Sequence, residues 1–460
     1  MNYNGVPIDG VLEEALRCGA AFAELFFEET TFTNIRVESH KVDRAVTGTD
    51  RGVGLRLLSD GIEYYASTTD LTDSGVAALL KTLCAYLGHG GSNGRVVLPG
   101  PSRAATPVAK HPFGIGITRK ADILLASQSE AYKIGDQIVQ VQGGYIDSSR
   151  RIAVFSSSGT SVEDEQVRTT MTFNVILEKN GRLRTGYESI GGSVGMELFN
   201  NDGHLTAVRT AVNRAIKMSN SIPIEGGAMT VVLSSEAGGT MIHEAVGHGL
   251  EADHIYRDLS VYTGRLNEQV ASPLISVVDD PTMPGMRGSF SYDDEGTPAA
   301  RNTVIENGVL RNYLFDLKHA GDSGMLATGN GRRESFRYPP IPRMTNTLIL
   351  SGRDDPSSII SEVDAGLLVL KMGGGEVNTV TGDFVFEITE GHLIEHGRIG
   401  PPVEGAIMLG NGPAILKEID RVGNDMGYGI GTCGKDTQGV PVADGQPTIR
   451  IPRIVVGGKK

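Results

Sequence analysis

The segment from His243 to His248 constrains this chain more strongly than any other part of its sequence. It carries two histidines and a glutamate, His243, Glu244 and His248, in a stretch with a helical pattern. A predicted buried strand at 229–233 and a glycine turn at 238–239 precede it. Imidazoles can hold a zinc ion, and a nearby carboxylate can take a proton from a zinc-activated water. A strand, a turn and such a helix therefore indicate a zinc hydrolase.

The spacing of the two histidines places a condition on this interpretation. They are five residues apart, whereas the common zincin pattern has them four apart on one helix face. On a regular α-helix, five residues leave the side chains roughly 140° and about 7.5 Å apart. Both can reach one metal only if the helix widens to a π-type turn or ends near Gly247, where Gly247 and Gly249 permit a distortion. The alternative is two unrelated histidines at a helix end.

A tetrahedral catalytic zinc needs a third protein ligand, and the sequence offers several. The candidates are carboxylate, histidine and cysteine residues after the helix: Glu251, Asp253, His254, His319, His392, His396 and Cys433. Cys433 is flanked by glycines, which leave its sulfur unobstructed. A lone cysteine in such a loop is otherwise a small buried residue, so residue types alone leave the choice open.

Charge and hydropathy argue against some classes of partner. The formal net charge is −13, with acidic and basic residues interspersed, whereas a nucleic-acid-binding protein would present a basic face. The N-terminus has neither the basic nor the apolar region of a signal peptide, and no apolar run approaches the roughly 20 residues of a membrane span. We therefore expect a soluble protein without nucleic-acid or membrane partners.

The three cysteines, Cys18, Cys84 and Cys433, lie far apart in the sequence. Such an odd and sparse set does not resemble a disulfide framework, which predicts a reducing, cytoplasmic location. Cys18 and Cys84 fall on helical patterns, where we expect them to fill core or surface positions.

The hydrophobic pattern changes near residue 224, which predicts two domains, 1–224 and 225–460. The first combines helical patterns at 11–21, 72–86, 119–133 and 202–219 with alternating strand patterns, so we expect an α/β domain with antiparallel strands and flanking helices. The second has short strands between turn residues, which predicts an antiparallel β-rich domain that carries the metal-site helix. The predicted fold class is α+β.

Several longer matches, in order along nearly the whole chain, resemble the TldD/PmbA family of metallopeptidases, in the TldD-type form that keeps the metal motif. They include Ala23-Glu24-Leu25-Phe26, the run from Gly239 to Asp253, Arg343-Met344-Thr345-Asn346-Thr347, Thr381-Gly382-Asp383-Phe384 and Gly431-Thr432-Cys433-Gly434-Lys435-Asp436. The resemblance implies an HExxxH zinc site in which His243, His248 and Cys433 are the ligands and Glu244 is the general base. It also implies a dimer, formed either with a related motif-free TldE/PmbA-type subunit or with a second copy of the chain.

The function predicted from these features is that of a zinc metalloprotease. It would hydrolyse peptide bonds in peptides or unstructured protein segments, with the substrate extended against a sheet edge at 372–377 or 381–387. Two alternatives remain: a binding or scaffold protein with a structural or vestigial zinc site, and a zinc amidohydrolase that acts on small molecules. Glu244 favours an enzyme, because a structural site needs no base.

Overall fold

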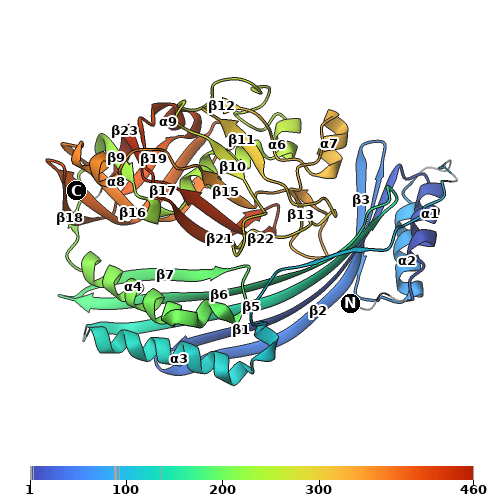
Figure 1. The fold of residues 1–460 in the computed structure, drawn as a ribbon, viewed down its shortest axis with the longest axis horizontal. Coiled ribbons are helices and arrows are strands. Elements are labelled where there is room, and N and C mark those ends of the chain that lie inside the picture. The colour runs from blue at the N-terminus through green and yellow to red at the C-terminus, as the bar shows by residue number, and fades with distance from the viewer. Residues whose placement is uncertain (1–2, 4, 88–90, 93, 136, 459–460) are drawn as a thin grey trace.

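A long, curved sheet from the first half of the chain runs beneath a second body that is built from the second half (Figure 1). The computed structural model describes residues 3, 5–87, 91–92, 94–135 and 137–458. The predicted lack of a signal peptide concerns a stretch of which residues 1, 2 and 4 lie outside this range. Within the range, no helix is both long and apolar enough to span a bilayer.

The curved sheet is antiparallel except at one edge, where β4 runs parallel to β6. Its spatial order is β3-β2-β1-β5-β6-β4, and β7 also pairs with β6. The strands are β1 (Phe22–Glu38), β2 (Lys41–Ser59), β3 (Ile62–Thr68), β4 (Ser102–Ala105), β5 (Ile138–Ser156), β6 (Ser161–Lys179) and β7 (Arg182–Gly192). Alternate side chains of a strand point to opposite faces, so one face can pack on helices while the other faces the second body.

In the described part of the first half, four α-helices flank this sheet, as the helical patterns predicted. They are α1 (Ile8–Arg17), α2 (Asp73–Cys84), α3 (Ile117–Ile134) and α4 (Gly203–Met218). In Figure 1, α3 and α4 lie under the sheet on the side away from the second body, while α1 and α2 lie at its other end. Val208 and Val212 of α4 share a core with Tyr145 and Phe173 of the sheet. The predicted α/β arrangement of the first half is therefore confirmed.

The prediction that no cysteines are paired is wrong for Cys18 and Cys84, which form a disulfide. Their Cα atoms lie 5.5 Å apart, because α1 and α2 pack against each other through a core that includes Leu12 and Leu80. The two cysteines are 66 residues apart in sequence, and helical patterns do not reveal which helices become neighbours. A cytoplasmic location thereby loses the support it drew from unpaired cysteines.

The second half is β-rich and contains two larger sheets. The first has the order β16-β9-β23-β19-β17-β18-β8, and because β16 also pairs with β17, the five strands from β16 to β17 close into a barrel. Its strands are β8 (Ile222–Pro223), β9 (Gly227–Leu233), β16 (Ala365–Val377), β17 (Asp383–Glu395), β18 (Arg398–Glu404), β19 (Ile407–Asn411) and β23 (Ile449–Gly457), with β20 (Arg421–Val422) beside β23.

The second of these sheets has the order β12-β11-β10-β15-β22-β21. It comprises β10 (Val277–Asp279), β11 (Asn302–Glu306), β12 (Val309–Leu310), β15 (Asn346–Ile349), β21 (Gly427–Lys435) and β22 (Gln438–Gln446), and a separate pair is formed by β13 (Gly331–Arg332) and β14 (Ile341–Pro342). Short helices connect them: α5 (Thr240–Ile242), α6 (Ala252–Tyr256), α7 (Leu317–Ser323), α8 (Pro356–Ser361) and α9 (Gly412–Glu418).

The second half departs from the predicted antiparallel pattern in three pairings. β9 with β16, β15 with β22, and β8 with β18 run parallel. Each joins strands that are far apart in sequence, whereas hairpin signals report only neighbouring antiparallel strands. The fold class is α+β, as predicted. The proposed division at residue 224 stays a prediction; β8, just before it, already pairs with the second half.

Candidate metal centre

The segment that carries the two histidines is not a regular α-helix. After β9, α5 leads into a π turn at His243–Gly247, which a single 3-10 turn at His248–Leu250 follows. A π turn closes on the fifth residue instead of the fourth, so it brings residues five apart onto one side. The predicted departure from α geometry at Gly247 is confirmed.

Gly247 is held in place by a close approach from the neighbouring strand region. A Cβ atom at this position would lie 1.8 Å from the sulfur of Met344, a fully buried side chain. No side chain fits there unless the π turn or the Met344 region moves. The sequence therefore needs glycine here for packing.

A Gly247→Ala variant is expected to lose about 1–3 kcal/mol of unfolding free energy, the usual cost of overpacking a core. Chemical unfolding of the purified protein measures this loss. The matched control is Gly434→Ala in β21, because a Cβ there would have no neighbour within 4 Å. Equal stability of the two variants would contradict the packing argument.

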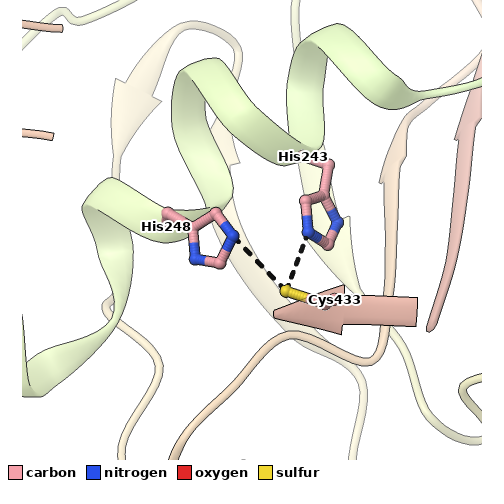
Figure 2. A group of neighbouring side chains, drawn as sticks. All are labelled: His243, His248 and Cys433. Carbon is pink, nitrogen blue, oxygen red and sulfur yellow. Dashed lines mark hydrogen bonds between the residues drawn. The ribbon is translucent and has the colours of Figure 1, made fainter. Parts of the chain in front are cut away.

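His243, His248 and Cys433 converge, although the cysteine lies in the β21–β22 hairpin far along the chain (Figure 2). The Nε2 atom of His243 is 3.1 Å from Cys433 Sγ, and Nε2 of His248 is 3.3 Å from it. The two rings stand nearly perpendicular, at 87°. All three side chains are buried, so the three donor atoms form a compact cluster beneath the surface.

The donor set fits a zinc ion. In a tetrahedral site with Zn–N near 2.0 Å and Zn–S near 2.3 Å, ligand nitrogen and sulfur atoms lie about 3.5 Å apart. The two nitrogen–sulfur distances in the structure are 3.1 and 3.3 Å, close to this value. Imidazole and thiolate are also the ligand types that zinc prefers.

Carboxylates orient both imidazoles from behind. The Nδ1 atom of His243 lies 2.7 Å from Asp444 Oδ1, and Nδ1 of His248 lies 3.0 Å from Glu251 Oε2. Lys435 in turn donates to Glu251 at 2.9 Å. Such partners fix the tautomer with Nε2 free to bind and raise ligand basicity, as in carboxylate–histidine–zinc triads.

Replacing Asp444 with asparagine is expected to weaken zinc binding by about 10- to 100-fold, because the orienting hydrogen bond to His243 loses its charge. Competition with a chromogenic chelator measures the affinity. Asp420→Asn serves as the control, since Asp420 pairs with Arg450 and contacts neither histidine. An Asp444→Asn protein that binds zinc as tightly as this control would count against the orienting role.

Among the protein groups themselves, the electrostatics favour a thiolate between two imidazolium rings. Burial alone would raise the pKa of the Cys433 thiol, but hydrogen bonds from His243 and His248 outweigh burial and lower it to about 5. Burial opposes protonation of His248, yet Glu251 and Cys433 raise its pKa to about 9. For His243, Asp444 overcomes burial in the same way and raises the pKa well above its usual range.

A cleft of about 580 Å³ opens onto these side chains. Glu244, whose side chain is 25% exposed, lines it together with His254. Glu244 Oε2 lies 3.9 Å from His248 Nε2, and burial raises the pKa of the Glu244 carboxyl. A carboxylate with a raised pKa beside the ligand cluster is placed to exchange protons with a molecule in the cleft.

In the described structure the other candidate ligands do not share the point where the three donor atoms converge, and Glu251 touches the cluster only from behind, at His248 Nδ1. Glu251, Asp253 and His254 form a second group of potential ligands. Lys435 donates to both carboxylates there, so its ammonium group already supplies the positive charge that a metal ion would bring. The remaining histidines have partners of their own: His319 with Asp316, His392 with the Gly400 carbonyl, and His396 with Asp364.

Sequence reasoning missed the roles of Asp444 and Lys435. Both lie on the hairpin that carries Cys433, and β22 places Asp444 beside His243. Lys435 lies in the glycine-rich segment that holds Cys433, but its contact with Glu251 depends on the fold. The only available signal was their proximity in sequence to Cys433.

Family models match three successive parts of the chain. The PmbA/TldA metallopeptidase domain 1 matches residues 23–86, the central domain residues 110–219, and the C-terminal domain residues 226–458. The chain belongs to the TldD/PmbA family of metallopeptidases. The predicted family resemblance is confirmed, and the metal-site cluster falls within the C-terminal family domain.

Relatives of this family member cover nearly its full length. A protein of Haemophilus influenzae described as a metalloprotease TldD homolog is 33% identical over 95% of this chain and 93% of its own. A protein of Saccharolobus solfataricus, described as a zinc metalloprotease TldD homolog, is 24% identical over 97% of this chain and 99% of its own.

Solved structures share the fold. TldE from Thermococcus kodakarensis superposes with a TM-score of 0.76 at 18% identity, over 98% of this chain and 99% of its own. The crystal structure of a Thermotoga maritima protein superposes with a TM-score of 0.79 at 22% identity, over 95% of this chain and 96% of its own. At these identities the likeness concerns the fold alone.

Proposed function

We propose that this chain is a zinc-dependent peptidase that hydrolyses peptide bonds in peptides or unstructured protein segments. The observation that carries the proposal is the convergence of His243, His248 and Cys433 at the floor of a cleft that Glu244 also lines. Three converging protein ligands and an adjacent carboxylate are what a catalytic zinc site requires, since a fourth position must stay open to solvent or substrate.

In this proposal His243, His248 and Cys433 hold the metal. When bound, a zinc ion in such a set supplies a Lewis acid for the scissile carbonyl and lowers the pKa of a water to roughly 7. The thiolate of Cys433 donates more charge than a carboxylate would, which moderates that Lewis acidity. Asp444 and Glu251 keep the two imidazoles in the ligating orientation.

Glu244 moves the proton. Its carboxylate takes a proton from the attacking water, holds it at Oε2 or Oε1, and passes it to the leaving amine nitrogen. The raised pKa of Glu244 suits this relay, because a buried carboxyl retains a proton more readily than an exposed one.

A free strand edge lines the cleft and suits an extended substrate. In the described chain β21 pairs with β22 alone, and its residues Gly429–Gly434 face Gly375–Val377 of β16 across the cleft. Peptides commonly add to such edges through main-chain hydrogen bonds. The predicted alternative at 381–387 is wrong, since Asp383–Glu387 pairs with β19 while Phe384 and Phe386 also pair with β16.

We further infer that the protein acts as a dimer. The structural likeness to TldE supports a related motif-free subunit as partner, and a homodimer is the alternative. Affinity purification from the native source with mass spectrometry of the co-purified chains distinguishes the two. A second family member in stoichiometric amount indicates the heterodimer, and this chain alone, with the native mass of two copies, indicates the homodimer.

Zinc affinity is expected to rise with pH from about pH 6 to about pH 8, by up to tenfold per unit for each proton displaced. The sign follows from the pKa shifts: His248, with a pKa of about 9, is protonated over this range and must lose a proton to bind zinc, whereas Cys433, with a pKa of about 5, is already a thiolate. Chelator competition at several pH values measures the slope. An affinity that does not change with pH would contradict the imidazolium–thiolate arrangement.

A comparison of substrates separates the proposal from its alternatives. A peptidase cleaves an unfolded polypeptide, a small-molecule amidohydrolase hydrolyses only small amides, and a scaffold protein with structural zinc does neither. Mass spectrometry of an unfolded test protein after incubation identifies the cleavage products. Hydrolysis of small amides without any polypeptide cleavage would overturn the proposed substrate class.

A further inference from the structure

A group of arginines lies between the curved sheet and the second body, away from the histidines. Arg168 of β6 is 6% exposed, Arg332 is 4% exposed, and Arg287 is half-buried. The chain as a whole carries a net charge of −13, so carboxylates are plentiful. Even so, among the described residues these three guanidinium groups form no ion pair with a carboxylate.

Neutral oxygens hold Arg168 and Arg287 in place. Arg168 donates to the carbonyls of Arg287 and Ser289, at 2.9 and 3.2 Å, and to the Gln166 side chain at 3.1 Å. Arg287 donates to the Gly431 carbonyl at 3.0 Å and to two threonine hydroxyls, those of Thr170 and Thr432, at 2.7 and 3.3 Å. A guanidinium has five N–H donors, so each of these two retains two N–H groups that make no hydrogen bond among the described residues.

Both side chains line a cavity of about 430 Å³ between the two bodies. Two other arginines in its wall are paired with carboxylates, Arg150 with Glu28 and Arg337 with Asp50, whereas Glu334 has no arginine or lysine partner among the described residues. Glu334 accepts a hydrogen bond from the Gly439 amide. The wall thus holds four arginines against three carboxylates, which leaves the cavity one net positive charge, and Arg168 and Arg287 are the two arginines without an ion-pair partner.

Burial of an uncompensated charge is unfavourable, which makes this arrangement informative. Burial lowers the pKa of Arg168 well below its usual range, and the charges of Arg332 and Arg287 add to the effect. The pKa of Arg287 is lowered by burial as well. A bound anion would relieve the repulsion, and guanidinium groups recognise planar carboxylates and phosphates through paired N–H donors.

We propose that this cavity is a binding site for a small oxyanion, a carboxylate or a phosphate, held between Arg168 and Arg287 with the hydroxyls of Thr170 and Thr432. The inference does not rest on the peptidase activity. Arg287 also contacts Gly431 and Thr432, the two residues before Cys433, so the anion would lie directly behind the strand that carries the metal-site cysteine.

Calorimetric titration of the zinc-loaded protein with inorganic phosphate tests the proposal. We expect saturable binding of one phosphate per chain, and about tenfold or greater weakening in Arg287→Gln, because a charged hydrogen-bond partner is lost. The matched control is Arg337→Gln: it lines the same cavity, but Asp50 already neutralises its charge. Because an oxyanion can also bind zinc, the titration is repeated with His243→Ala, which should retain phosphate binding.

Two further arms make the outcome decisive. A short peptide with a free C-terminal carboxylate is compared with its C-terminal amide: binding of the acid but not the amide identifies a peptide end as the occupant, and binding of phosphate alone identifies a free inorganic anion. Crystals of the unmutated protein soaked in tungstate locate the anion by anomalous scattering, whether or not the variants fold. Tungstate density between Arg168 and Arg287 is expected. Absence of saturable binding by every probe, equal binding in Arg287→Gln, or density confined to other places overturns the proposal.

Discussion

Replacement of Glu244 with glutamine is expected to lower the kcat for polypeptide cleavage by about 100- to 10,000-fold, the usual contribution of a general base. Glutamine has the same shape but cannot accept the proton. Glu244 lines the cleft without being one of the three converging ligands, so the variant should bind zinc as the unmutated protein does. Rates measured by mass spectrometry, together with zinc content from elemental analysis, give both quantities.

This variant also distinguishes catalysis from scaffolding. A Glu244→Gln protein that is folded, contains zinc and has lost only cleavage supports the enzyme. Undiminished cleavage would rule out Glu244 as the base. The conservative variant Glu244→Asp is a useful companion: it keeps the carboxylate but shortens its reach, so partial activity is expected because proton transfer depends on distance.

Removal of Cys433 is expected to have the second large effect. Cys433→Ala should reduce zinc affinity by more than about 100-fold and abolish cleavage, because loss of a ligand costs more than the 10- to 100-fold typical of an outer-shell change. His243→Ala should behave in the same way. Dialysis against a zinc buffer followed by elemental analysis measures the retained metal.

The control for these ligand variants is His254→Gln. His254 lines the same cleft and was itself a candidate ligand, but the structure places it with Glu251 and Asp253. The His254→Gln protein should therefore keep one zinc per chain. Full zinc retention by both Cys433→Ala and His243→Ala would eliminate the proposed site, and loss of zinc in His254→Gln would instead indicate a fourth protein ligand and a closed, structural centre.

The local geometry of the site could be predicted from the sequence, because it depends on residues close together in the chain. The five-residue spacing of His243 and His248 is incompatible with a regular helix, and two glycines offered a place to distort it. The structure has a π turn at that point. Gly247 also proved necessary for a reason that the sequence does not show, the buried sulfur of Met344.

The long-range parts of the site could not be predicted from local patterns. Spacing and residue type left seven possible third ligands, and only the family resemblance selected Cys433. Its position depends on the parallel pairing of β15 with β22, and parallel pairing leaves no hairpin signal. The Asp444–His243 contact and the Cys18–Cys84 disulfide were missed because local patterns do not show which distant segments become neighbours.

The central claim is that polypeptide cleavage depends on zinc held by His243, His248 and Cys433. The most direct measurement follows digestion of an unfolded polypeptide by the protein isolated from its native source, with any subunit that accompanies it, before chelation, after chelation and after zinc is restored. We predict one zinc per copy of this chain, loss of cleavage with the metal and recovery on its return. Cleavage that persists after complete zinc removal would contradict the account.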